Sequence, residues 1–215
     1  MSCPKLVSMG YNGGKGHQGG KAMQDLYTKR LILREWKPSD AGDMFDYARD
    51  PDIGPNAGWA PHKDIGESRR VIEMFMESKD EIYAMVLQED GRVIGSIGLH
   101  ERTPSRVMPS GKSREIGYVL TKKLWGKGLV PEACARLIIH AFKDMAVDEL
   151  WCGHYSFNER SRAVVEKSGF RYVETVRKTL DRLDGREVDL LAYRMTIGDF
   201  EELQTALLKR SGIIL

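Results

Sequence analysis

The amino-acid sequence predicts a single mixed α/β domain. Short runs in which apolar and polar residues alternate, typical of half-buried strands, recur along the chain, and runs with apolar residues at helical spacing separate them. The sequence EDG at 89–91 joins two of the strand-like runs, as a hairpin turn would. Because no internal repeat and no linker interrupts residues 25–210, we expect residues 25–215 to form one domain.

Residues 1–24 differ in composition from the rest of the chain. Glycine, lysine and polar residues dominate there without a helical or strand period, so we expect a flexible arm, either native or an upstream leader before Met23. The stretch GYNGGKGHQGGK at 10–21 resembles a phosphate-binding loop in composition only. Neither Lys15 nor Lys21 has the glycine spacing and the following Ser or Thr that a nucleotide-binding P-loop requires.

The composition limits the classes of partner. The 215 residues carry a formal charge of +2, and the first 22 hold three lysines and no acid, so the remainder has 30 basic and 31 acidic residues. This balance argues against nucleic acid as the main partner. No apolar run approaches the ~18–20 residues of a membrane span, and no signal peptide is recognisable. Three widely spaced cysteines (Cys3, Cys134 and Cys152) suit a reducing compartment, so we expect a cytoplasmic protein.

The first half of the predicted domain contains a strand, a helix, a loop, a second helix and a strand hairpin. Ser39 is a natural N-cap for the first helix. The loop is rich in Pro, Gly and Asn and contains Trp59 and His62. The strand occupies residues 30–36, the first helix 38–50, the loop 51–65 and the second helix 67–79, and the two strands of the hairpin occupy 81–88 and 92–102.

The second half alternates strands with helices. A polar loop at 103–112 leads to it, and Gly169 closes its second helix. In the first of these helices an apolar stripe that includes Cys134 faces the core, whereas Arg136, His140 and Lys143 face away. The predicted elements are strand 114–120, helix 131–145, strand 149–157, helix 158–168, strands 170–180 and 187–196, and helix 198–209.

The stretch LWGKGLVPEA at 124–133 has the features of an anion site at the start of a helix. Gly126 and Gly128 permit positive φ and close approach of a ligand, and Lys127 adds a positive charge. Pro131 suits a first helical turn, and Glu132 favours the positive end of the helix dipole. A simple tight turn explains the same residues equally well, so the stretch alone leaves both interpretations open.

Three stretches together resemble one known family. TKRLILREW (28–36), REIGYVLTKKLWGKGLVPEA (114–133) and NERSRAVVEKSGF (158–170) are similar, in this order, to segments of the GNAT N-acetyltransferase superfamily. The similarity is greatest to the subgroup that contains the RimJ/RimL-like ribosomal-protein N-terminal acetyltransferases. The resemblance implies the acyl-CoA N-acyltransferase fold, an α/β (α+β) fold with a mostly antiparallel central sheet flanked by helices and with its fourth and fifth strands splayed apart.

The resemblance also implies an acetyl-CoA site. Strand 114–120 would pair with the pantetheine arm, and the loop before the next helix would hold the pyrophosphate. Trp125 and Val130 depart from the family's usual loop residues, and Pro131 lacks the amide and hydroxyl of the threonine often found there. The implied cofactor-binding residues are Val119, Leu120, Trp125, Gly126, Lys127, Gly128, Leu129, Val130 and Asn158. Asn158 is also the expected N-cap of helix 158–168, and capping alone would explain it.

Glu115 and Ser161 are the implied catalytic residues. Glu115 would deprotonate the attacking amine, directly or through water, and Ser161 would act near the thioester because the family's acid tyrosine position holds Val165. Strand alternation puts Glu115 and Tyr118 on opposite faces, and a bulge typical of this strand in the family would bring both towards the cleft. The alternative roles are a solvated strand end for Glu115 and a first-turn helix serine for Ser161.

The acceptor amine would meet Trp59, His62, His100 and Tyr118, and the 51–65 loop is where the family places substrate-specificity residues. The alternative role for Tyr118 is a core aromatic. His100 and His154 end strands near the cleft and could relay a proton, or could be structural. Arg162 could reach a phosphate or face solvent. No grouping of His, Cys, Asp and Glu has metal-ligand spacing, so we expect no metal site.

These observations predict an N-acetyltransferase that transfers the acetyl group of acetyl-CoA to a primary amine by direct attack in a ternary complex. The acceptor could be a protein N-terminus or a small amine, and a homodimer is common among relatives. The alternative is a catalytically silent module that senses acyl-CoA or binds a protein through the same fold. A nucleotide enzyme is disfavoured because the P-loop spacing is absent.

Overall fold

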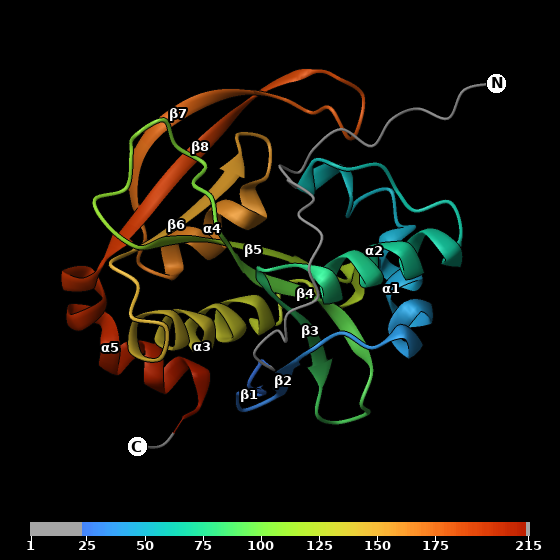
Figure 1. Cartoon of the computed structure of the whole chain (residues 1–215), viewed down its shortest axis with the longest axis horizontal. Helices are drawn as coiled ribbons and strands as arrows, with labels where there is room; N and C mark the ends of the chain where they lie inside the picture. The colour runs from blue at the N-terminus through green and yellow to red at the C-terminus, as the bar shows by residue number, and fades with distance from the viewer. Residues whose placement is uncertain (1–22, 214–215) are drawn as a thin grey trace.

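The computed structural model describes residues 23–213 and contains one eight-stranded sheet. The strand order is β1-β2-β3-β4-β5-β6-β8-β7, and every neighbouring pair is antiparallel except β5 and β6, which are parallel. Helices lie against the sheet (Figure 1). The predicted mixed, mostly antiparallel α/β fold is confirmed.

Most predicted elements are present within one to three residues of the expected bounds. The short first strand is additional to the predicted set. The strands are β1 (Leu26–Tyr27), β2 (Leu31–Arg34), β3 (Glu81–Leu87), β4 (Val93–His100), β5 (Ser113–Leu120), β6 (Glu149–Tyr155), β7 (Arg171–Thr179) and β8 (Glu187–Thr196). The α-helices are α1 (Ala41–Ala48), α2 (Ile65–Glu77), α3 (Leu129–Lys143), α4 (Glu159–Lys167) and α5 (Ile197–Ser211).

Both faces of the sheet are covered, which explains why β3 is a continuous apolar run. Its residues alternate between two clusters: Tyr83 and Met85 pack with α3 and α5, and Ile82 and Ala84 pack with α1 and α2. Figure 1 shows α3 beside α5 and α1 beside α2, in agreement with the contacts between these pairs. Cys134 of α3 and Cys152 of β6 are buried in the first cluster, as the apolar stripe of helix 131–145 predicted for Cys134.

The parallel pair β5–β6 separates partway along its length. Its pairing begins at Ser113 with Glu149 and ends at Ile116 with Cys152, so the last four residues of β5 have no partner on that side. The resemblance predicted splaying of these two strands, and the register confirms it. On its other side β5 remains paired with β4 up to Leu120 and Gly95. A gap therefore opens in the sheet between β5 and β6. The helix that follows each strand, α3 after β5 and α4 after β6, lies beside this gap.

Local capping places the helices around this gap. Asn158 Oδ1 accepts a hydrogen bond from Ser161 N at 3.0 Å, so the predicted N-cap of α4 is confirmed. Asp64 caps α2 in the same way through Glu67 N. The prediction that Ser39 caps α1 is wrong. A short 3-10 turn precedes α1, and Asp40 accepts from Lys37 N there instead.

Two further expectations differ from the structure. The bulge expected in the 114–120 strand is absent, because β4 and β5 pair without a register shift from Gly95 to His100. His140 does not face solvent; it is buried, with Nε2 at 2.9 Å from Glu81 Oε2. An opposite charge on β3 permits this burial, and periodicity alone could not reveal that partner.

The predicted N-terminal arm lies, apart from Met23 and Gln24, outside the described residues, as does Cys3. Met23 packs against the larger core cluster, and its amide donates to Glu35 Oε1 at 2.6 Å. Across residues 23–213, no helix combines the length and apolar character needed to cross a membrane.

Candidate active site

A cavity of about 570 Å³ occupies the gap between β5 and β6. The 51–65 loop, α1 and α2 form one wall, and the start of α3 and the first turns of α4 form another. Every residue that the sequence analysis assigned to the cofactor, the chemistry or the acceptor lines this cavity, except Lys127. The fold thus gathers residues that are more than 100 positions apart in the chain.

The loop before α3 offers free backbone donors at one end of the cavity. Gly126 and Gly128 have φ of 78° and 74°, the left-handed region that glycine adopts without strain. In the described part of the chain, the amides from Gly126 to Val130 donate to no protein acceptor. Five consecutive free N–H groups at the positive end of α3 form a cradle that suits a phosphate group. Pro131 follows in the first turn and has no N–H to contribute.

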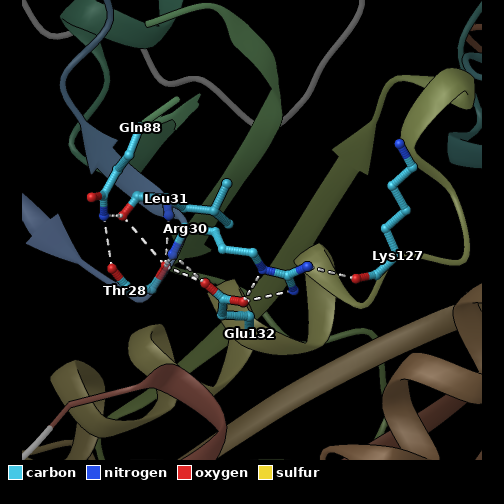
Figure 2. A network of polar contacts seen from close by, with 6 residues as sticks. All are labelled: Thr28, Arg30, Leu31, Gln88, Lys127 and Glu132. Carbon is cyan, nitrogen blue, oxygen red and sulfur yellow. Dashed lines mark hydrogen bonds and ion pairs between the residues drawn. The ribbon is translucent and has the colours of Figure 1, made fainter. Parts of the chain in front are cut away.

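An ion-pair network holds this loop from behind (Figure 2). Arg30 Nη1 donates to the carbonyl of Lys127 at 2.9 Å, and Arg30 Nε donates to Glu132 Oε2 at 2.7 Å. The buried Glu132 carboxylate also accepts from the Thr28 hydroxyl at 2.7 Å and from Arg30 N at 2.8 Å. Glu132 is therefore an anchor between α3 and the turn after β1, in addition to its place at the helix dipole.

The aromatic residue of the loop is fixed in place. Trp125 Nε1 donates to the Leu120 carbonyl at 2.9 Å, and the guanidinium of Arg160 lies 4.4 Å from the centre of a Trp125 ring. Arg160 and Lys167 both line the cavity from α4. Arg162, for which the sequence left both a phosphate contact and exposure to solvent open, pairs with Glu166 at 2.9 Å on the exposed face and does not line the cavity.

Tyr118 and Ser161 meet on the α3 and α4 side of the gap. Their hydroxyl oxygens are 2.8 Å apart, and Tyr118 OH also lies 3.3 Å from the Ser161 carbonyl. Burial raises the pKa of Tyr118 well above its ordinary value, so its hydroxyl remains protonated. Val165, at the family's tyrosine position, is buried in the core. The hydroxyl of Tyr118, from β5, therefore lies beside Ser161, one helical turn before Val165 in α4.

Glu115 lies on the opposite face of β5 from Tyr118, as strand alternation predicted. Its Oε2 accepts from Arg102 Nε at 2.6 Å, whereas Oε1 has no hydrogen-bond partner among residues 23–213. The side chain is 13% exposed, so the carboxylate is accessible from the cavity without being fully hydrated. The free oxygen is the atom that could accept a proton.

His100 is the cross-strand partner of Glu115 and projects from the same face. Its Nδ1 lies 2.9 Å from Asp80 Oδ2. The ring occupies space left by two glycines, since a Cβ at Gly117 would lie 3.2 Å from Nε2 and one at Gly98 3.4 Å from it. A proton on Nδ1, bonded to Asp80, would leave Nε2 as an acceptor towards the cavity.

The remaining predicted polar residues have structural partners. Asn158 bridges α4 to the 51–65 loop, because its Nδ2 donates to the Asn56 carbonyl at 3.0 Å. His62 Nδ1 contacts the Ser68 hydroxyl at 2.8 Å, and burial lowers the pKa of His62. His154 is buried with both ring nitrogens in contact, at 3.0 Å from the Tyr155 carbonyl and 3.2 Å from Tyr193 OH.

Comparison with known families agrees with this geometry. Residues 30–171 match the acetyltransferase (GNAT) domain, a span that includes the cradle, the splayed strands and α4. This chain belongs to the GNAT acetyltransferase family. It is an N-acetyltransferase, and the family's fold uses acetyl-CoA as the acetyl donor. The residues present suit that donor, since the cavity has an unpaired strand edge for an amide-bearing arm and a cradle of free amides for a pyrophosphate.

Individual relatives of this GNAT domain are distant. "Uncharacterized N-acetyltransferase p20" of Bacillus licheniformis is 25% identical over 80% of this chain and 96% of its own length. "Putative ribosomal N-acetyltransferase YdaF" of Bacillus subtilis (strain 168) is 32% identical over 52% of this chain and 58% of its own length, in agreement with the RimJ/RimL-like resemblance. The microcin C7 self-immunity acetyltransferase MccE, solved with acetyl-CoA and AMP, superposes with a TM-score of 0.64 at 20% identity over 79% of this chain and 93% of its own.

Among the residues described, no group of His, Cys, Asp and Glu is arranged to hold a metal ion. Four features of this GNAT domain were not predicted from the sequence: the Glu132 anchor, Arg160 in the cavity wall, the pairing of Arg102 with Glu115 and the pairing of Asp80 with His100. Charged residue types at the ends of strands and helices were the only available indication of these contacts. Their partners lie on other elements, so spacing could not reveal them.

Proposed function

We propose that this GNAT domain transfers the acetyl group of acetyl-CoA to a primary amine by direct attack in a ternary complex. The observation that carries the proposal is the position of the cavity. It lies where β5 loses its partner and has the free amides of residues 126–130 at one end and an unshared carboxylate oxygen at the other. Donor and acceptor could therefore meet beside the exposed edge of β5.

In this proposal the cradle, with Arg160 and Lys167, holds the phosphates of the donor, and the free edge from Gly117 to Leu120 pairs with its pantetheine arm. Backbone groups alternate in direction along a strand: the Leu120 carbonyl faces this edge and already accepts from Trp125, whereas the Val119 carbonyl lies against Gly95 of β4. Acetyl-CoA supplies an activated thioester. All other steps require only binding, orientation and movement of protons by the protein.

Glu115 is the proposed base. Its Oε1 takes a proton from the ammonium group of the acceptor, directly or through water, so that the neutral amine attacks the thioester carbonyl carbon. The nitrogen loses its second proton as the carbon–sulfur bond breaks and the sulfur leaves as a thiolate. Ser161, bonded to the protonated Tyr118 hydroxyl, is the proposed relay: it gives a proton to the thiolate and regains one from the nitrogen, while the proton on Glu115 passes to water. The products are an amide and free CoA.

Free thiol release tests the proposal. The protein is incubated with acetyl-CoA and a panel of peptides with free N-termini and small primary amines, and thiol is followed with a colorimetric reagent. We expect amine-dependent, saturable release. Saturable binding of acetyl-CoA with no release for any acceptor would instead indicate the silent acyl-CoA-sensing module. The widely spaced cysteines and near-neutral charge of the domain lead us to propose a cytoplasmic location and no nucleic-acid partner.

A further inference from the structure

A second cavity of about 310 Å³ adjoins the first at the proposed reaction centre. The two share Arg102, Glu115, Tyr155 and Arg182 among their lining residues, so the second cavity begins at the proposed base. Its walls come from the 51–65 loop, the segment after β4, and the β7–β8 hairpin. The volume is that of roughly ten water molecules, enough for a small polar group together with several carbon atoms.

Arg182 is fixed at the boundary of the two cavities. Its carbonyl accepts from Ala60 N at 3.0 Å, and its backbone forms an isolated bridge with Trp59. The turn of the hairpin is also bonded internally, since Leu183 N and Gly185 N both donate to the Leu180 carbonyl. The hairpin and the 51–65 loop therefore hold this residue from two sides, and its position does not depend on a ligand.

The charges around the second cavity leave two cations without an acidic partner. Arg102 is neutralised by Glu115 at 2.6 Å, but Arg182 and Lys178 form no ion pair within residues 23–213. Asp181 is the other acid of the lining, so the set of Arg102, Lys178, Arg182, Glu115 and Asp181 has a net charge of +1.

The surroundings of Arg182 also disfavour its own charge. Arg182 is exposed to solvent, but the protein atoms that surround it in part, followed by the charge of Arg102, lower its pKa. Burial likewise lowers the pKa of His62 across the main cavity, with contributions from Arg182 and Arg70 in the same direction. An anion placed beside Arg182 would relieve this unfavourable field, and a guanidinium presents a fork that matches a carboxylate.

We propose that Arg182 binds a carboxylate of the acceptor, so that this enzyme acts on primary amines that carry a carboxylate close to the amine. The proposal rests on the proposed acetyl transfer and names its substrate class. The amine would lie at Glu115 and the carboxylate in the second cavity, because the two residues share its lining. The carboxylate could belong to a small amino acid or dipeptide, or to an acidic side chain near a peptide N-terminus.

Matched acceptor pairs test the subsite. Alanylalanine is compared with alanylalaninamide, and a peptide with aspartate as its second residue is compared with the same peptide carrying asparagine. We expect the free acid to be preferred in kcat/KM by roughly 10- to 100-fold, the range of one charge-assisted hydrogen-bonded pair. The dipeptide pair reports a terminal carboxylate and the peptide pair a side-chain carboxylate, so the two arms distinguish the sources.

Variants of Arg182 test whether this residue causes the preference for the free acid. In Arg182→Gln the preference is expected to fall to within about two-fold of unity, and Arg182→Lys is expected to keep part of it. Arg177→Gln is the matched control, because Arg177 is an exposed arginine of β7 that pairs with Asp189 at 2.8 Å and lines neither cavity. Thermal unfolding of each variant establishes that the fold is retained.

Direct binding measurements test the carboxylate subsite without turnover. Alanylalanine and its amide are titrated into the protein saturated with CoA and followed by calorimetry. Equal affinities for acid and amide, or a preference that survives in Arg182→Gln, would overturn the subsite. Absence of thiol release with every acceptor would overturn the acetyl-transfer proposal, whereas an acid preference in binding would still support the subsite.

Discussion

The guanidinium of Arg30 donates a 2.9 Å hydrogen bond to the carbonyl of Lys127, the central residue between the two glycines of the phosphate cradle. The same guanidinium pairs with Glu132 at 2.7 Å on the first turn of α3. Binding the carbonyl from behind leaves the amides of the loop available on the other side. Figure 2 shows the Lys127 side chain extending away from Arg30 while its carbonyl points towards it.

Replacement of Glu132 by Gln is expected to weaken both the fold and donor binding. The amide keeps the shape but removes a charge that accepts three hydrogen bonds and pairs with the Arg30 guanidinium, so we expect a loss of about 2 kcal/mol in the free energy of unfolding. The affinity for acetyl-CoA should fall because the cradle loses its support. Urea unfolding and calorimetry measure the two effects. Asp189→Asn, which breaks an exposed pair with Arg177, is the control and should cost less than about 0.5 kcal/mol.

The left-handed backbone at Gly128 predicts a conformational effect of Gly128→Ala. A Cβ there would lie 3.7 Å from Arg30 Nη2, so space is available, but φ of 74° costs an L-residue about 1–2 kcal/mol. We expect reduced stability and weaker acetyl-CoA binding. Gly42→Ala is the control, because Gly42 lies in α1 and a Cβ added there would have nothing within 4 Å. That change should stabilise the protein by roughly 0.5–1 kcal/mol.

Glu115→Gln tests the proposed base. Turnover should fall by roughly 10²–10⁴-fold, the usual contribution of a positioned general base, whereas the affinity for acetyl-CoA should change less than about two-fold. Steady-state kinetics and calorimetry separate the two quantities. An unchanged rate removes Glu115 from the mechanism. His100→Asn is the companion variant, since a large loss there with full activity in Glu115→Gln would assign the proton to the His100 ring held by Asp80.

Tyr118→Phe and Ser161→Ala test the hydroxyl pair. A thiolate is a good leaving group, with a thiol pKa near ~8.5, so each loss of kcat should stay below the roughly 10²-fold at the low end of general acid catalysis. The two hydroxyls are 2.8 Å apart, and their effects should therefore not be additive in the double variant. Additive losses would show that the two groups act independently. Pre-steady-state thiol release provides the measurement.

The pair between His140 and Glu81 predicts a pH-dependent stability. Burial opposes the charge on His140, but hydrogen bonds with Glu81 and Asp144 raise its pKa above the ordinary value. The contribution of protonated His140 is therefore complete below the unfolded pKa near ~6.5 and is lost as pH rises through the raised value. The hydrogen bond with His140 lowers the pKa of Glu81, so its contribution is complete above about 4.3 and is lost as pH falls through the lowered value.

The stability difference between the parent and His140→Gln should consequently be largest between roughly pH 4.5 and 6.5 and decline at higher pH. Urea unfolding at several pH values measures it. A difference that does not change with pH would contradict the assigned charge pair. Cys134→Ala is a useful comparison, because burial raises the pKa of that thiol to about 12 and its effect should not vary across this range.

The predictions that the sequence supported best depend on neighbours along the chain. The cap of α4 joins Asn158 to Ser161, three residues away, and residue type at that spacing was sufficient to identify it. Apolar periodicity likewise located β3 and α3, because each buried stripe repeats locally. The splay of β5 and β6 came from the family resemblance and was confirmed by the register.

Contacts between distant residues required the folded chain. The sequence contains Glu132, Arg30 and Thr28, but only the packing of α3 against the β1–β2 turn brings them together across more than 100 positions. In the same way Tyr118 meets Ser161 across the gap, and Arg182 meets the 51–65 loop. The sequence by itself determined which segments become helices and strands, since these follow from local spacing, and which family the chain resembles, since three of its stretches are similar to that family. Tertiary structure decided which charged and hydroxyl groups face one another, because electrostatic and hydrogen-bonding partners are set by distance in space and not along the chain.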